Sequence, residues 1–136
     1  QVPERASSGL VHVNVGGDPG TGKQFNVHMG QLDLVALRAT ISDRTAAVYF
    51  DNPAFLGFIE TQGNEISRIA HQHGAISVVG ADPSSLGVLT PPADYGADIV
   101  CGDIQPLGMH MQYGGGHGGF IATRDEVEAA LQRPAV

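Results

Sequence analysis

The sequence has little cysteine, few basic residues and no long apolar run, and each shortage excludes a class of protein. Cys101 is the single cysteine, so no internal disulfide can form and a disulfide-stapled secreted domain is excluded. Only seven Lys and Arg residues are present, and the formal net charge is -7. Nucleic-acid binders need clustered basic residues, so we exclude nucleic acid and anionic membranes as partners. No apolar run approaches the roughly 20 residues of a membrane span, no signal peptide is recognisable, and we expect a cytoplasmic protein.

The rest of the composition is that of a folded domain with many turns. The chain has 136 residues, which fits one domain, and it is 42% hydrophobic and 15% charged. Nineteen glycines gather mainly at 16–30 and 114–119, where the backbone must turn tightly or approach another group closely. We therefore expect a single globular domain.

Apolar strands and amphipathic helices alternate along the chain. Strands are predicted at 10–15, 46–50, 75–81, 98–101 and 119–122. Helices are predicted at 34–41 behind the cap Asp33, at 62–73 before Gly74, and from the capping box Thr123–Glu126 to about 132. Near-continuous apolar strands separated by helices predict an α/β fold of three layers, with a mostly parallel sheet covered on both faces.

Acidic residues follow three of these predicted strands. Asp51 directly follows the segment 46–50, Asp82 follows 75–81, and Asp103 comes soon after 98–101. Ligands of open α/β sheets bind beyond the carboxyl ends of the strands, so these carboxylates are candidate site residues. Aspartate is also common in turns and caps, so a structural role stays open for Asp51 and Asp103. Asp82, after a wholly apolar strand, is the strongest candidate to meet a ligand cation.

The glycine-rich segment Gly17–Lys23 has the spacing of a phosphate-binding P-loop. That motif continues with a Ser or Thr that holds magnesium, and a helix begins there. Here Gln24 follows the lysine, and the next residues lack helical periodicity. We interpret the segment as a flexible connection and keep a nucleotide-binding domain as the least favoured alternative.

Other reactive residue types lack the spacing of a known site. The six histidines do not supply the three or four converging ligands of zinc, so no metal is expected. Cys101 lies within an apolar strand and is expected to be a buried, inert thiol. Ser84, Ser85 and Tyr113 have no histidine–aspartate pair at recognisable spacing, so we assign them structural roles. The glycine run 114–119 either offers backbone N–H groups to an anion or forms a tight connection.

Two stretches of the chain carry a family likeness. The first is TAAVYFDNPAFLG at 45–57. The second runs from Ala81 to Phe120 and includes Pro91-Pro92, Tyr95-Gly96-Ala97-Asp98 and Tyr113-Gly114-Gly115. In order and spacing they resemble the glycine decarboxylase P-protein family, specifically subunit 1 of its two-subunit form. The resemblance implies part of the large domain of a fold type I pyridoxal phosphate (PLP) transferase, as a single partial domain over residues 1–136.

The resemblance also implies where the cofactor binds. In catalytic members, the lysine that forms a Schiff base with PLP follows the strand matching 98–101, and that position is Gln105 here. A Schiff base needs a primary amine, and the one lysine of the chain, Lys23, lies far upstream. Asp82 matches the carboxylate that pairs with the pyridinium nitrogen. We expect PLP on a partner subunit and not covalently on this chain.

The function implied is that of an enzyme subunit that holds no catalytic residue of its own. With P-protein subunit 2 it would act in the oxidative decarboxylation of glycine and pass the aminomethyl group to lipoylated H-protein, within a hetero-oligomer. The loop with Tyr113, Gly114, Gly115 and His117 is the expected contact with the partner, or a wall of its active site. The alternative from another class is a catalytically inactive interaction module of the same fold.

Overall fold

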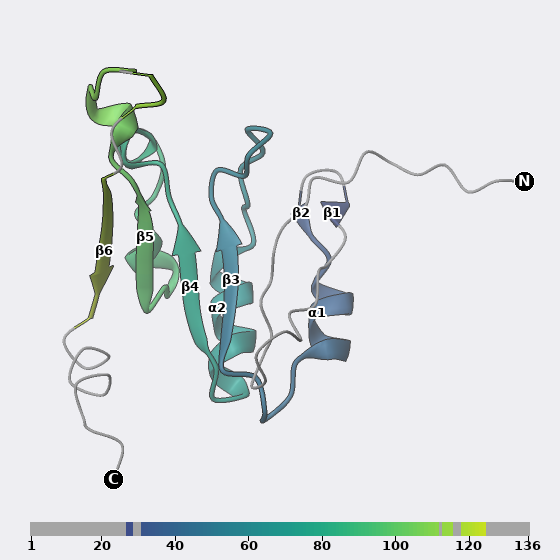
Figure 1. Cartoon of the computed structure of the whole chain (residues 1–136). Coiled ribbons are helices and arrows are strands. Elements are labelled where there is room, and N and C mark those ends of the chain that lie inside the picture. The colour runs from purple at the N-terminus through teal and green to yellow at the C-terminus, as the bar shows by residue number, and fades with distance from the viewer. Residues whose placement is uncertain (1–26, 29–30, 112, 116–117, 125–136) are drawn as a thin grey trace, which may run out of the picture.

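The computed structural model describes residues 27–28, 31–111, 113–115 and 118–124. They form a four-stranded sheet of order β3-β4-β5-β6 and a separate two-stranded pair, β1 with β2 (Figure 1). The strands are β1 (Val27–His28), β2 (Gln31–Leu32), β3 (Ala47–Asp51), β4 (Ile76–Gly80), β5 (Ile99–Asp103) and β6 (Gly119–Thr123). The helices are α1 (Leu34–Thr40) and α2 (Gly63–Gln72), with 3-10 turns η1 (Pro83–Gly87), η2 (Pro92–Tyr95) and η3 (Gln105–Leu107).

The sheet is mostly parallel, as the sequence predicts. Strand β4 pairs in parallel with both β3 and β5, whereas β6 runs antiparallel along the outer side of β5. The connection from β3 to β4 contains α2, because parallel neighbours need a crossover long enough to return the chain to the same end. This topology places the carboxyl ends of β3, β4 and β5 at one edge of the sheet.

The start of α1 and the end of α2 follow the signals predicted for them. Asp33 caps α1, and its carboxylate accepts hydrogen bonds from the N–H groups of Val35 and Ala36 at 2.9 and 3.1 Å. Helix α2 ends before Gly74, whose φ of +72° is a left-handed conformation that favours glycine. These predictions of the sequence are confirmed.

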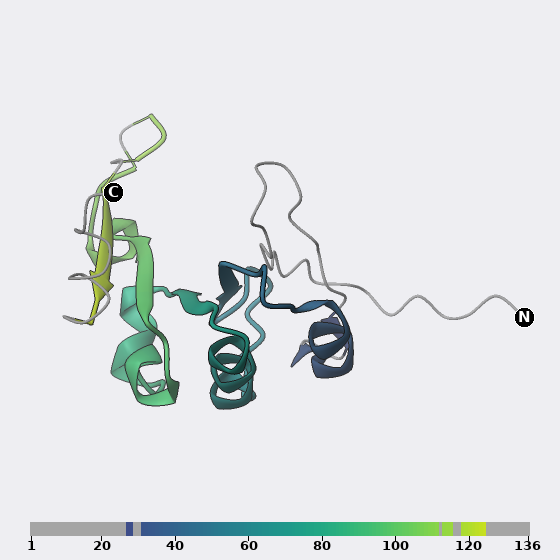
Figure 2. The same ribbon diagram turned by 90° about the horizontal axis from the view of Figure 1, so that it is seen from below.

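The core lies between the sheet and one layer of helices. Figure 2 shows α1 and α2 on the same side of the sheet. The buried core side chains are Leu32, Leu37, Ile41, Val48, Phe50, Ile66, Ile69, Ala70, Ala75, Val79, Tyr95 and Ala97. Alternation along β3 explains this one-sided packing, since Val48 and Phe50 are buried while Tyr49 and Asp51 are only partly covered. The second helical layer of the expected three has no counterpart among the described residues.

Some expectations fall outside the described residues. They are the strand at 10–15, the Gly17–Lys23 segment, His117 and the helix after Thr123. No helix in the described part of the chain is long and apolar enough to cross a membrane.

Candidate functional site

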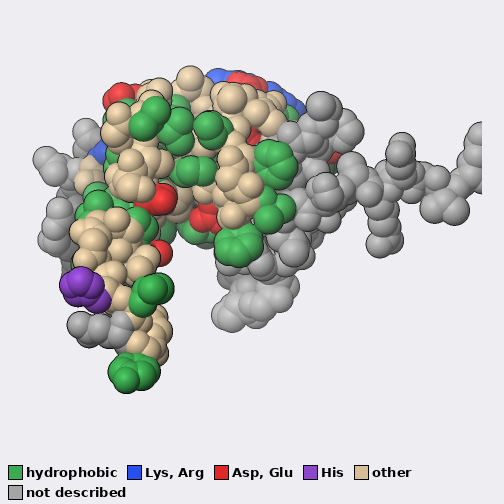
Figure 3. Space-filling model, turned by 90° about the horizontal axis from the view of Figure 1, so that it is seen from above, with side chains coloured by type: hydrophobic (Ala, Val, Ile, Leu, Met, Phe, Trp, Pro, Cys, Tyr) green, Lys and Arg blue, Asp and Glu red, His purple; other side chains and the backbone are tan. Residues whose placement is uncertain are grey.

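A cleft of about 560 Å³ opens at the carboxyl ends of the parallel strands. Asp51, Asp82 and Asp103 all line it, each from the end of a different strand. The register explains their proximity, because Asp51 pairs with Gly80 on β4 and Gly80 pairs with Cys101 on β5. Figure 3 looks down on this edge and shows acidic side chains in a hollow between projecting lobes. The structure thus brings together the three carboxylates that the sequence singles out.

Asp82 and Asp103 line the cleft and stabilise the turns that follow their strands. The Oδ1 atom of Asp82 accepts hydrogen bonds from the Ser84 N–H at 2.9 Å and the Ser84 hydroxyl at 2.7 Å. The Oδ1 atom of Asp103 accepts one from the Gln105 N–H at 2.9 Å. Asp82 and Asp103 therefore combine a structural role in their turns with a position in the cleft. Ser84 contributes to the turn after β4, in agreement with the structural role assigned to it.

Asp51 is held by a tyrosine from its own strand. The Tyr49 hydroxyl donates a hydrogen bond to Asp51 Oδ1 at 2.5 Å. Both side chains lie directly over Gly80, where any Cβ would clash with Asp51 Oδ1 and the Tyr49 hydroxyl. Burial is the main cause that raises the pKa of Tyr49 above its ordinary value of 10.0, and the hydrogen bond to Asp51 and its charge add to the effect. Tyr49 is thus a neutral hydrogen-bond donor at physiological pH.

Cys101 differs from the expectation of a buried thiol, because it is only partly buried and lines the cleft. Its position on β5 directs the side chain to the sheet face of Asp51, which carries no helix among the described residues. Burial raises the pKa of the Cys101 thiol, and the Asp51 charge raises it further. The thiol is therefore held in its protonated, less nucleophilic form.

The charges of the cleft have one sign. Its described lining contains three aspartates and no lysine, arginine or histidine. Each aspartate uses Oδ1 within its own strand or turn, and no described residue donates a hydrogen bond to Oδ2 of Asp51, Asp82 or Asp103. A phosphate needs cationic or N–H donors around it. The described lining therefore does not fit the phosphate of PLP.

Gln105 lies beside the cleft, in the turn η3 that follows β5. Its side-chain amide donates a hydrogen bond to the Met109 carbonyl at 3.4 Å. Among the described residues no side chain carries a primary amine, since Lys23 lies outside them. The described residues thus cannot form a Schiff base with PLP.

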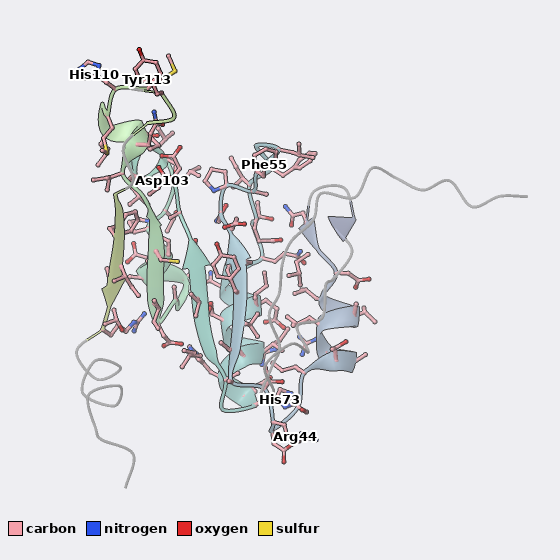
Figure 4. All side chains as sticks on the ribbon, viewed as in Figure 1. Arg44, Phe55, His73, Asp103, His110 and Tyr113 are labelled. Carbon is pink, nitrogen blue, oxygen red and sulfur yellow. The ribbon has the colours of Figure 1, made fainter. Side chains whose placement is uncertain are left out.

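The glycine loop between β5 and β6 is a tight turn in its described part. The N–H groups of Gly114 and Gly115 both donate to the Met111 carbonyl, so they do not form a nest for an anion. Tyr113 has a φ of 55°, and its side chain is fully exposed at the tip of the projecting loop (Figure 4). Of the expected contact residues, Tyr113, Gly114 and Gly115 lie on this projection, and His117 lies outside the described residues.

A second projection, the apolar loop 53–59, forms the other side of the cleft. Phe55 is 97% exposed and Leu56 61% exposed, although both are large apolar residues. Sequence reasoning missed this feature. The available signal was the run Pro-Ala-Phe-Leu-Gly-Phe-Ile, which has neither strand nor helix periodicity and directly follows a strand end.

A buried polar network fixes the base of the apolar loop. The Asn52 side chain accepts a hydrogen bond from the Glu60 N–H at 3.1 Å and donates to the Glu60 carbonyl at 3.2 Å and the Tyr95 hydroxyl at 3.3 Å. The Glu60 carboxylate in turn accepts from the Leu32 N–H at 2.7 Å. The loop is therefore held at both ends.

At the opposite end of the sheet, polar side chains pair with one another. His71 Nε2 lies 2.7 Å from Asp98 Oδ2, which also accepts a hydrogen bond from the Ser77 N–H at 2.7 Å. This contact joins α2 to the start of β5. No group of three or more His, Cys, Asp or Glu among the described residues could hold a metal ion.

Comparison with known proteins gives one consistent result. The sequence model of the family described as glycine cleavage system P-protein matches residues 20–134. The probable glycine dehydrogenase (decarboxylating) subunit 1 of Staphylothermus marinus is 42% identical to the chain, over 81% of this chain and 24% of that protein. The crystal structure of glycine decarboxylase (P-protein) of the glycine cleavage system, in inhibitor-bound form, is similar with 44% identity and a TM-score of 0.66, over 74% of this chain and 22% of that one.

A more distant structural neighbour shows the fold alone. It is described as an O-acetylhomoserine (thiol)-lyase of Campylobacter jejuni with N′-pyridoxyl-lysine-5′-monophosphate, and it is 21% identical with a TM-score of 0.57. This likeness covers 75% of this chain and 24% of that one. The chain spans about a quarter of the length of the proteins it matches.

Proposed function

Since the chain belongs to the glycine cleavage system P-protein family, we propose that it is part of subunit 1 of a two-subunit glycine dehydrogenase (decarboxylating). The reaction would be the oxidative decarboxylation of glycine, with transfer of the aminomethyl group to lipoylated H-protein. Residues 1–136 would form one part of a larger PLP-transferase domain, because the matching proteins are about four times longer.

One observation supports a division of labour between the subunits. Gln105 stands where the family resemblance places the Schiff-base lysine, and its amide is bound to the Met109 carbonyl. The acidic lining of the cleft also opposes a phosphate group. PLP, which supplies the electron sink for decarboxylation when bound, would therefore be held by the partner, subunit 2.

This chain would contribute shape and position rather than bond-making groups. The loop with Tyr113, Gly114, Gly115 and His117 would contact the partner or complete the wall of its active site. Asp82 would stand at the position of the carboxylate that pairs with the pyridinium nitrogen in catalytic members, but it would not make that pair. Its Oδ1 atom is bound to Ser84, and the cofactor would lie on the other subunit.

The test uses full-length subunit 1 and its subunit 2, purified separately and then mixed with PLP. Exchange of labelled bicarbonate into glycine, in the presence of lipoylated H-protein, measures the activity. We expect exchange with the pair and none with either subunit alone. A stable pair without exchange would instead support the inactive interaction module, and exchange by subunit 1 alone would contradict the proposed division of labour.

A further inference from the structure

Large apolar side chains are exposed on the three chain segments that follow the strands of the acidic cleft, and one of them, Phe55, lines the cleft itself. They come from the loop after β3, the turn after β4 and the segment after β5, and each of these elements follows a strand that supplies one aspartate. We call them the apolar rim: Phe55, Leu56, Val88, Leu107, Met111 and Tyr113. Their exposed fractions run from 61% for Leu56 to full exposure for Tyr113. Large apolar side chains exposed on neighbouring segments indicate a contact site.

The rim and the cleft form one surface with an apolar border and an acidic floor. Figure 4 places Phe55 and Tyr113 on separate projections at the same end of the molecule as Asp103, with Arg44 and His73 at the other end. In the floor, Oδ2 of each of the three aspartates accepts no hydrogen bond from the described residues. The surface thus offers apolar contact at its border and unused carboxylate oxygens at its centre.

We infer that this surface receives a segment of the partner subunit in which a lysine or arginine side chain is flanked by apolar residues. The inference rests on the proposed function, because it requires a partner subunit. The cation would enter the cleft between Asp51, Asp82 and Asp103, and the flanking residues would pack against the apolar rim.

Charge complementarity selects this occupant. A carboxylate or phosphate would meet three negative charges with no described cation in the lining, and like-charge contact opposes binding. A second copy of this chain would present the same carboxylates, so its own floor would oppose it. An apolar segment without a cation would bury the aspartates unpaired, which is costly. A long basic side chain avoids this cost, because its stem is apolar and its head is positive.

The first experiment measures the affinity of full-length subunit 1 for subunit 2 by isothermal titration calorimetry. Asp82→Asn and Asp103→Asn remove charge but keep the oxygen that accepts the hydrogen bonds of their turns. We expect each change to weaken binding by about tenfold or more, and to reduce the dependence of affinity on salt. Asp43→Asn, at an exposed loop away from the cleft, is the control with the same charge change and should leave the affinity unchanged.

The rim is tested with a similar pair of variants. Phe55→Ala removes a fully projecting ring of the rim, whereas Val35→Ala removes an apolar group that is 78% exposed on α1. We expect a loss of affinity of about tenfold or more for the first change and none for the second. Equal effects within either pair, rim or floor, would overturn the inference.

A labelling experiment tests whether the partner subunit, or instead the rest of the longer chain, covers the apolar rim. Met111→Cys in a Cys101→Ala background is treated with a membrane-impermeant maleimide, and modification of residue 111 is followed by peptide mass. We expect rapid labelling of subunit 1 alone and protection in the complex. Protection without the partner would show that the chain covers its own rim, and equal labelling in both states would show that the partner binds elsewhere; either result overturns the inference.

The two proposals fail in distinguishable ways. If the pair is active but the aspartate and rim variants bind as tightly as wild type, only the docking surface is wrong. If the two subunits do not bind at all, both the proposed function and the docking surface are wrong.

Discussion

The same residue types are buried or fully hydrogen-bonded in one region of the molecule and exposed or partly hydrogen-bonded in another. The first region is the core with the start of the sheet, and the second is the cleft edge, where β3, β4 and β5 end. Phe50 on β3 is 1% exposed, whereas Phe55, five residues later, is 97% exposed. Asp98 at the start of β5 is bound by His71 and the Ser77 N–H, whereas Asp103 at the end of β5 leaves Oδ2 without a described partner. Among the described residues, no buried side-chain nitrogen or oxygen lacks a hydrogen bond.

This contrast separates stability from function along the length of the sheet. Paired polar groups and buried apolar groups lower the free energy of the folded state. The core consists of such groups, so its residues are explained by stability alone. The exposed ring of Phe55 and the unbound Oδ2 atoms of the three aspartates add little to folding. Their presence at one edge supports the proposal that this edge binds a segment of the partner subunit.

The sharpest test of the contrast is a pair of phenylalanine truncations in the full-length chain. Phe50→Ala should lower the free energy of unfolding by about 3–5 kcal/mol, because it removes a fully buried ring and leaves a cavity. Phe55→Ala should change it by less than about 0.5 kcal/mol, because its ring is exposed. Urea unfolding measures both, and a large loss for Phe55→Ala would place that ring in a core formed by the longer chain.

The next largest effect is expected at the base of the apolar loop. Asn52→Ala removes three hydrogen bonds to Glu60 and Tyr95 in a buried site, and we expect a loss of about 1–3 kcal/mol. Asn64→Ala, exposed on α2, is the control and should cost nothing measurable. If the two variants unfold at the same urea concentration, the network does not hold the loop.

A glycine pair tests the packing on the floor of the cleft. Gly80→Ala places a methyl group against Asp51 Oδ1 and the Tyr49 hydroxyl, and overpacking of this kind costs about 1–3 kcal/mol. A Cβ at Gly87 meets no atom within 4 Å, so Gly87→Ala should leave the thermal midpoint nearly unchanged. Equal midpoints for the two variants would mean that the tyrosine–aspartate pair does not lie over Gly80.

The smallest effect concerns the hydrogen bond from Tyr49 to Asp51. Tyr49→Phe removes one donor and should cost about 0.5–1.5 kcal/mol at neutral pH, measured by urea unfolding. Because folding raises the pKa of Tyr49, the stability from this residue is present below its ordinary value of 10.0 and is lost as the pH rises above it. The decline in stability above pH 10 should therefore be less steep in Tyr49→Phe, and identical pH profiles would contradict this assignment.

Much of the fold follows from local signals, but the cleft edge follows only in part. Asp33 and Gly74 bound the two helices as their chemistry predicts, and the apolar segments become strands. The three aspartates were found because a parallel sheet gathers its carboxyl ends at one edge. The partial exposure of Cys101 was missed, because strand alternation alone does not say whether a face is covered by a helix.

The exposed loop 53–59 was missed for a related reason. An apolar run normally indicates burial, and nothing in the sequence marks Phe55-Leu56 as a segment that is exposed in the structure. A contact with another molecule does not produce the helix or strand periodicity from which burial is predicted.

The most direct test of the account is the location of the cofactor. Full-length subunit 1, subunit 2 and their mixture are incubated with PLP and reduced with borohydride, and the pyridoxyl group is located by peptide mass. We predict the label on a lysine of subunit 2 alone, in the mixture and in isolated subunit 2, with none on subunit 1. A stoichiometric pyridoxyl group on Lys23, or on any other lysine of full-length subunit 1, would contradict the claim that this subunit shapes a cofactor site that its partner holds.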